Sequence, residues 1–360
     1  MPSYPPARAV VAAVSFLVLL SSSQAGAAEP PDVGFTHKDW ELACDNTRTC
    51  RAAGYQSESD ERAVSVLLTR KAGPRQVVTA ELQIGSYDEA EGGPSRAGPT
   101  AMKVNGRALG NVAVDKGTMI GRLSAAQTDA LVEALTQTGT VTWSNKGGSW
   151  TLSGAGATAV LLKMDDFQGR VGTPGALVRK GAKSEDSVLP AVPAPVIVAA
   201  PVPAPTGKSV LPRAALVALL PELRKDFEED TCTGLAKAAK VEEELQVERL
   251  SPARLLVSTT CWTGAYNMGS AYWVINAKPP YSPQLVTDKA SDYDDGTIVA
   301  AQKGRGLGDC WSHEEWVWDG TRFVQSLSET TGMCRLVAAG GAWRLPTFVS
   351  TVRKAKRAGG

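Results

Sequence analysis

Few side chains of this sequence could act as an acid, a base or a nucleophile. The 360 residues include 2 histidines, His37 and His313. Ser312 precedes His313, but adjacent residues of a strand face opposite sides of the sheet. The G-x-S-x-G elbow of a serine hydrolase does not occur. We therefore name no catalytic residue. A hydrolase that acts on a cell-wall or peptide substrate through His313, or through two carboxylates of 288–295, is the alternative prediction.

Cofactor and metal-binding patterns are also weak. Glycines recur at alternate positions over 304–308. A phosphate-binding loop needs a helix to open after it, whereas a cysteine and a strand pattern follow here, so a tight turn beside a disulfide is expected. The acidic loop 288–296 places only one carboxylate in a calcium-binding D-x-D-x-D-G frame. Asp165 and Asp166 are neighbours on an expected helix, where adjacent side chains diverge, so we expect both to be exposed. The sequence thus predicts no cofactor and no metal ion.

Tryptophans are the residues that most suggest binding. Of the nine in the chain, six follow residue 211. An Asp-Gly turn at 319–320 predicts a hairpin, in which Trp316 lies opposite Phe323 and shares a face with Trp318. Indole rings on a rigid sheet suit sugars or protein side chains, and a small disulfide-linked core filled by indoles is the alternative. We predict a binding surface that includes Trp311, Trp316 and Trp318.

The cysteines predict disulfides rather than a metal site. They are Cys44, Cys50, Cys232, Cys261, Cys310 and Cys334. An even count, no C-x-x-C pair and no histidine at metal-ligand spacing favour this interpretation. Cys44 and Cys50 lie far from the others and are expected to pair. The later cysteines allow three connectivities, and we choose the sequence-local ones, Cys232–Cys261 and Cys310–Cys334. Each bond would stabilise the fold by about 2–4 kcal/mol.

The N-terminal residues predict export. Arg8 is the only charged side chain before Glu29, an apolar run covers 9–20, and small residues follow at 25–28. This is the pattern of a cleaved secretory signal over 1–28. The 12 residues of the run are fewer than the roughly 20 that span a bilayer. We expect no transmembrane segment after cleavage, and a location in the periplasm or outside the cell.

The charge balance excludes one class of partner. Removal of Arg8 leaves 37 basic and 37 acidic residues, so the mature chain has no surplus positive charge for nucleic acid. An envelope protein or a glycan is the expected partner. The expected role is non-enzymatic binding in the bacterial envelope.

A proline-rich segment divides the sequence. Residues 188–205 read VLPAVPAPVIVAAPVPAP, and this density of proline predicts a semi-rigid extended linker within 183–210. We expect an N-terminal α+β domain over 29–182, a C-terminal disulfide-linked β-rich domain over 211–353, and a basic flexible tail over 354–360. Both domains should be mainly antiparallel with flanking helices, which makes the fold class α+β.

Three helices are expected to flank the sheets. Residues 123–139 carry a helical apolar stripe, with Ser124 and Gln127 placed to form a capping box. Residues 156–169 and 214–230 show the same periodicity. Alternating patterns between the helices predict the strands.

Six stretches of the sequence form a recognisable set. They read KDWELACDNTxTCRAAGY over 38–55, LSGxGA over 152–157, DDxQGR over 165–170, CWxGAYN over 261–267, GLGDC over 306–310 and WxWDG over 316–320. Together they resemble the bacterial family known as domain of unknown function 1176. The resemblance spans nearly the whole mature chain and implies an exported, two-part envelope protein of proteobacteria, with no activity assigned. The Trp and Cys positions of the first half are also similar to invasion-associated locus B proteins. No functional residue is carried over from either family.

Overall fold

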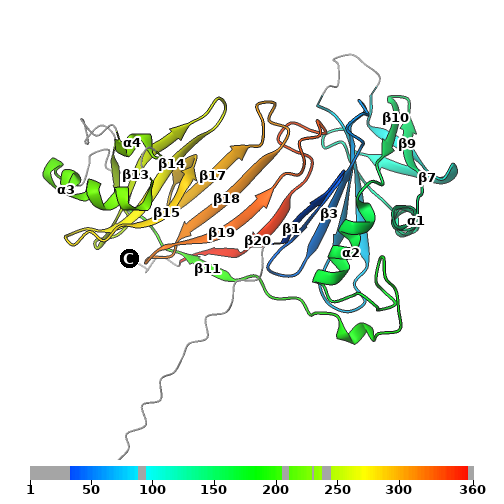
Figure 1. Cartoon of the computed structure of the whole chain (residues 1–360), viewed down its shortest axis with the longest axis horizontal. Coiled ribbons are helices and arrows are strands. Elements are labelled where there is room, and N and C mark those ends of the chain that lie inside the picture. The colour runs from blue at the N-terminus through cyan, green and yellow to red at the C-terminus, as the bar shows by residue number, and fades with distance from the viewer. Residues whose placement is uncertain (1–32, 88–94, 205–210, 229–230, 237–244, 356–360) are drawn as a thin grey trace, which may run out of the picture. The chain divides into compact units, whose positions relative to one another are not determined.

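The computed structural model describes residues 33–87, 95–204, 211–228, 231–236 and 245–355 (Figure 1). The expected signal segment and most of the expected basic tail lie outside these ranges. Within them the structure has five β-sheets, nearly all antiparallel, and a few short helices. The expected α+β class is thereby confirmed. None of the described helices is long and apolar enough to cross a bilayer.

The first sheet is antiparallel and is covered on both faces. Its strands are, in spatial order, β1 (Val33–His37), β2 (Trp40–Cys44), β3 (Cys50–Tyr55), β4 (Val64–Arg70), β5 (Val78–Ile84) and β8 (Ile120–Arg122). On β2, Trp40 and Leu42 enter one hydrophobic core, whereas Ala43 joins a second core on the opposite face. Because side chains alternate along a strand, two covering layers explain why β4 is buried along almost its whole length.

A second sheet and two helices close the first core. The sheet has the order β10 (Gly148–Leu152), β9 (Val141–Asn145), β6 (Gly98–Val104) and β7 (Arg107–Val114), and the helices are α1 (Ala125–Thr136) and α2 (Ala157–Phe167). The capping box of α1 is present as expected. Gln127 N–H donates to Ser124 Oγ at 3.3 Å, and Ser124 N–H donates to Gln127 Oε1 at 2.9 Å. Asn105 and Gly106, both with positive φ angles, form the turn between β6 and β7.

Two further sheets of the C-terminal half share a core. One has the order β12 (Gln246–Arg249), β13 (Arg254–Thr263), β14 (Met268–Asn276) and β15 (Gln284–Ala290). The other has the order β16 (Asp292–Asp294), β17 (Thr297–Lys303), β18 (Trp311–Trp318), β19 (Phe323–Thr330) and β20 (Leu345–Val349). Leu256 and Val274 of the β12–β15 sheet cluster with Ile298 and Trp318 of the β16–β20 sheet. A separate core joins the β12–β15 sheet to α3 (Arg213–Leu223) and α4 (Thr233–Ala236). The 3-10 helix η2 (Arg224–Asp226) follows α3 directly.

The middle of the proline-rich segment forms a β-strand, and the expected linker stays a prediction. After the short 3-10 helix η1 (Glu185–Ser187), β11 (Val196–Ala199) pairs in parallel with β21 (Thr351–Lys354). No proline interrupts β11, so its amides are free to join a ladder. Ile197 is buried in this arrangement. The pairing ties the middle of the proline-rich segment to the end of the described chain.

Side chains join the two halves of the described chain. Trp343 Nε1 donates to Ser65 Oγ at 2.7 Å, within a small core to which both halves contribute. Asn46 makes two hydrogen bonds with the backbone of Val349, at 3.0 and 2.8 Å. The domain boundaries expected near 182 and 211 stay a prediction.

Asp165 is buried, so the expectation that it is exposed on α2 is wrong. Its Oδ2 accepts the N–H groups of Leu177 and Val178 at 2.7 and 3.0 Å, and its Oδ1 lies 3.5 Å from Arg70 Nη1. The loop after α2 returns to the helix and covers this carboxylate, which the helical pattern alone does not indicate. Burial raises the pKa of Asp165, although the two N–H donors and the nearby arginines oppose that shift. Asp166 is exposed as expected.

Candidate binding surface

The three tryptophans predicted to form a binding surface do not lie on one surface. Trp318 is buried in the core shared by the two C-terminal sheets, and Trp316 is partly buried against the same core. β17 and β18 pair without a register shift, with Trp316 opposite Ile298 and Trp311 opposite Lys303. Because side chains alternate along a strand, Trp311 projects from the other face. Of the three, Trp311 alone remains a candidate for binding.

The hairpin between β18 and β19 also differs from the expected register. Trp318 lies opposite Phe323, and Trp316 lies opposite Gln325. The connection spans 319–322 rather than two residues, because the Asp319 carboxylate accepts the N–H groups of two residues that follow it, at 2.7 and 2.9 Å. A longer turn moves every pair along the hairpin, and a bulge after Glu315 shifts the pairing again.

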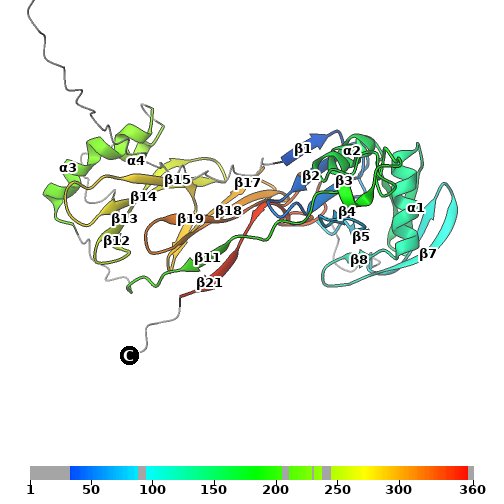
Figure 2. The same cartoon turned by 90° about the horizontal axis from the view of Figure 1, so that it is seen from below.

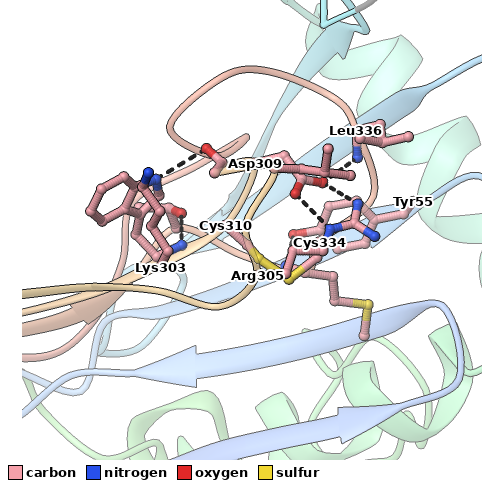
Figure 3. The surroundings of a disulfide bond; sticks show 12 residues. Tyr55, Lys303, Arg305, Asp309, Cys310, Cys334 and Leu336 are labelled. Atoms are coloured by element: carbon pink, nitrogen blue, oxygen red, sulfur yellow. Dashed lines mark hydrogen bonds and ion pairs between the residues drawn. A yellow bond between two sulfur atoms is a disulfide. The ribbon is translucent and has the colours of Figure 1, made fainter. Parts of the chain in front are cut away.

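The three disulfides are present and pair as predicted. They are Cys44–Cys50, Cys232–Cys261 and Cys310–Cys334. The last joins the loop after β17 to the segment after β19 (Figure 3). A Cβ atom at position 304 would lie 2.7 Å from Cys310 Sγ, so Gly304 allows the backbone to approach the disulfide closely. The glycines of 304–308 thus form a turn beside a disulfide, as expected.

The buried carboxylate of Asp309 stabilises the conformation of the loop after β17. Its carboxylate is buried and accepts two hydrogen bonds from Arg305, at 2.7 and 2.5 Å, and one from Leu336 N–H at 2.8 Å (Figure 3). Burial alone would raise the pKa of Asp309, but these hydrogen bonds and the Arg305 charge outweigh it, so the pKa is lowered. Asp309, Cys310 and Cys334 place ligand-type atoms within 4.8 Å of one another. The sulfurs are bonded to each other and the carboxylate pairs with Arg305, so this group stabilises a loop.

Trp311 is held at the edge of this loop. Its Nε1 donates to Gly308 O at 3.0 Å, and its backbone N–H donates to Thr331 Oγ1 at 2.8 Å. Lys303 Nζ lies 5.4 Å from the centroid of the indole (Figure 3). A cation at this distance is attracted to the negative face of the ring. The indole is therefore partly covered by the protein's own lysine.

The loop between β13 and β14 is hydrogen-bonded to the loop after β17. Asn267 Nδ2 donates to Lys303 O at 2.9 Å, and Lys303 N–H donates back to Asn267 Oδ1 at 2.8 Å. Gln302 Nε2 donates to Met268 O at 2.8 Å. A Cβ atom at Gly306 would lie 3.4 Å from the Tyr266 ring, so the ring is against the turn. These contacts hold the two loops together.

Four large apolar side chains are exposed on this framework. They are Tyr266, Met268, Leu307 and Leu336, with exposed fractions of 47%, 45%, 55% and 39%; we name them the loop patch. The sequence placed Tyr266 in an aromatic set with nearby tryptophans, but the predicted binding surface consisted of tryptophans alone and included none of the four. The available signal was an apolar residue inside each of the glycine-containing stretches GAYN and GLGDC. Grouped exposed apolar residues are typical of surfaces that bind another molecule.

The residues considered for a hydrolase lie on different elements of the described chain. His313 Nε2 lies 2.8 Å from Glu315 Oε1 on β18, while Ser312 projects from the opposite face. Within the described ranges, the His313 side chain makes no hydrogen bond to a hydroxyl or a thiol. His37 is exposed on β1, and 295–296 form the turn between β16 and β17. A hydrolase therefore stays the alternative prediction.

The segment after β19 also contacts the N-terminal half. Met333 N–H and Tyr55 Oη both donate to Glu41 Oε1, at 2.7 and 2.5 Å. Arg335 Nη2 donates to Asp39 Oδ1 at 2.8 Å. Burial raises the pKa of Glu41, although the two hydrogen bonds and the Arg335 charge oppose the shift. The segment that carries Leu336 of the loop patch is thus held by the N-terminal half and by the loop after β17.

A groove in the N-terminal half is less suited to recognition. It has a volume of about 1160 Å³ and is lined by parts of α1, β5 and the loop after α2. Two of the arginines in its wall are already paired, Arg70 with Asp165 at 3.5 Å and Arg75 with Asp186 at 2.9 Å. We therefore place the candidate site at the loop patch.

Comparison with known proteins supports the resemblance noted in the sequence. The family model described as "Protein of unknown function (DUF1176)" matches residues 34–350. The chain is 27% identical over 329 residues to "Uncharacterized protein YpfG" of Escherichia coli (strain K12), a match that covers 86% of this chain and 90% of that protein. No solved structure matches the chain, and the likeness to invasion-associated locus B proteins is not shown. The three disulfides are typical of a chain that folds in an oxidising compartment. The protein belongs to the DUF1176 family.

Proposed function

We propose that this protein is an exported, periplasmic binding protein that recognises an envelope protein through the loop patch. The expected signal segment and the three disulfides support the location. One observation carries the role: four large apolar side chains are exposed at the start of β14 and on loop segments that hydrogen bonds and a disulfide join.

The fixed shape matters because ordering a loop on binding costs free energy. Loops that already hold one backbone conformation avoid most of that cost. Here the Cys310–Cys334 disulfide, the buried Asp309 carboxylate and the paired hydrogen bonds of Asn267 hold the backbone beneath the patch. The backbone that carries the exposed side chains therefore already has its conformation before a partner binds, as at the energetic centre of a protein interface.

A protein partner fits the loop patch better than a glycan. Recognition of a sugar needs an open aromatic face, whereas the Trp311 ring is half-buried and has Lys303 over it. Tyrosine and methionine, present at Tyr266 and Met268, are enriched at protein interfaces, and methionine adapts its shape to a partner.

The test is a quantitative cross-linking pull-down from periplasm, with the mature chain and its disulfides intact. Leu307→Asp places a charge in the loop patch without touching a buried atom, and we expect partner recovery to fall about tenfold. Val77→Asp is the matched control, since Val77 is an exposed apolar residue of the N-terminal half; it should recover the partner as the wild type does. Equal recovery by Leu307→Asp and the wild type would reject the patch. Capture of glycan instead of protein would reject the protein partner.

The alternative of an envelope hydrolase has the His313–Glu315 contact as its only support in the described chain. It requires turnover of a cell-wall or peptide substrate that disappears in His313→Ala. Equal turnover by the wild type and His313→Ala would remove this assignment.

A further inference from the structure

The strand β21 has one open edge. Its odd-numbered residues face β11, as shown by Thr351 N–H, which donates to Pro195 O at 2.8 Å. In a parallel ladder the intervening residues direct their N–H and C=O groups to the other side. Val352 and Lys354 therefore point their backbone groups away from β11, and no described strand pairs with them there (Figure 2).

Within the described chain, the edge of β21 is protected by its short length and its two basic side chains alone. Every residue of β21 is exposed, including Val352. No proline occurs in β21, and no bulge interrupts its pairing with β11. A row of unpaired backbone groups of this kind is ready to accept another strand.

The positive charges of Arg353 and Lys354 determine which strands this edge would attract. Arg353 has no ion-pair partner among the described residues. Lys354 Nζ lies 3.9 Å from Asp295 Oδ2, but both side chains are exposed, so water weakens that pair. A second copy of the chain would bring like charges together, whereas carboxylates would be attracted.

We propose that β21 binds an extended acidic segment of a partner protein by strand addition. The backbone of that segment would pair with the N–H and C=O groups of Val352 and Lys354. Its Asp and Glu side chains would lie across from Arg353 and Lys354, where opposite charges stabilise a pair of strands. This site does not depend on the loop patch.

Calorimetric titration of the full mature chain tests the proposal. The probes are two end-blocked peptides of about ten residues, which is long enough to cover a strand. One alternates Thr and Glu, and the other alternates Thr and Lys. The wild type is expected to bind the Glu peptide at least about tenfold more tightly than the Lys peptide. Equal binding of the two peptides, or binding of neither, would overturn the proposal.

Two variants at one position isolate the backbone contribution. Val352→Pro removes an outward N–H that β11 does not use, and proline is tolerated on the open side of an edge strand. Val352→Ala also removes the valine methyl groups but keeps the N–H. The proline variant is expected to bind the Glu peptide about fivefold more weakly than the alanine variant, which corresponds to one net hydrogen bond. Equal affinity of the two variants would mean that charge alone attracts the peptide, and would overturn strand addition.

A charge variant and its control complete the experiment. Arg353→Glu combined with Lys354→Glu should weaken binding of the Glu peptide by about tenfold or more. Arg107→Glu changes the charge of another edge strand, β7, and should leave the affinity unchanged. A similar loss from Arg107→Glu would show that net charge controls binding, and would overturn the assignment to β21. Hydrogen exchange at Arg353 N–H, which faces β11, checks that the β11–β21 ladder is intact in each variant.

Discussion

Asp165→Ala is expected to destabilise the protein strongly, because Asp165 is the acceptor at the centre of a buried polar cluster. The carboxylate accepts Leu177 and Val178 N–H and lies 3.5 Å from the buried guanidinium of Arg70. Truncation leaves two partly buried donors and one buried cation without this partner. Removing one member of a buried ion pair costs about 3–5 kcal/mol, and we expect this loss in the free energy of unfolding.

Two further variants complete the comparison. Asp165→Asn keeps an oxygen for both N–H donors, which share Oδ2, and places an amide NH2 group opposite the Arg70 guanidinium, where the carboxylate has an acceptor oxygen. Its expected cost is about 1–3 kcal/mol. Asp166→Ala is the control, because Asp166 is exposed on the same helix, and its effect should stay within about 0.5 kcal/mol. The assay is urea unfolding followed by tryptophan fluorescence and circular dichroism, with the disulfides intact. Equal effects of Asp165→Ala and Asp166→Ala would refute the assigned burial.

The pH dependence gives an independent check on Asp165. Burial raises its pKa above the ordinary value of 3.8. Between the ordinary and the raised pKa, the folded state binds more protons than the unfolded state, so the free energy of unfolding increases as the pH falls. Asp165→Asn lacks this group. The stability of the wild type relative to Asp165→Asn should therefore increase as the pH falls from neutrality toward the ordinary pKa, and a decrease would contradict the raised pKa.

Two other substitutions test the packing of the C-terminal half by the same unfolding assay. Gly304→Ala would place a Cβ atom 2.7 Å from Cys310 Sγ, so a loss of about 1–3 kcal/mol is expected, and a loss under about 0.5 kcal/mol would contradict that contact. Trp318→Ala empties a core position and should cost about 3–5 kcal/mol. Trp311→Ala removes a half-buried ring and should cost less than about 2 kcal/mol. Equal losses at the two tryptophans would contradict their assignment to opposite faces of the sheet.

Features set by neighbouring residues could be predicted from the sequence. The capping box of α1 depends on Ser124 and Gln127, which are three positions apart, and the Cys44–Cys50 disulfide closes a short turn. Both need only local geometry. The α+β class also follows from patterns that extend over single strands and helices.

Features set by distant segments could not be predicted in this way. The burial of Asp165 depends on a loop that returns over α2, and the strand β11 forms because β21 is available beside it. The faces of Trp311 and Trp316 follow from their spacing in one strand, whereas the position of Phe323 depends on the length of a turn. Alternation within a strand is visible in a sequence, but the partner that covers each face is not.

The segment that follows β19 shows why a loss of binding alone does not assign a residue to the loop patch. It carries Leu336 at the surface, while Met333 and Arg335 contact the N-terminal half. A change at Asp309 or at the Cys310–Cys334 disulfide would move this segment and its contacts, so a loss of binding there would not identify a contact residue. The exposed side chain of Leu307 is not among the contacts described above that join the loops, whereas the Tyr266 ring packs against the Gly306 turn. A residue belongs to the binding surface only if its substitution lowers partner recovery while the free energy of unfolding stays that of the wild type.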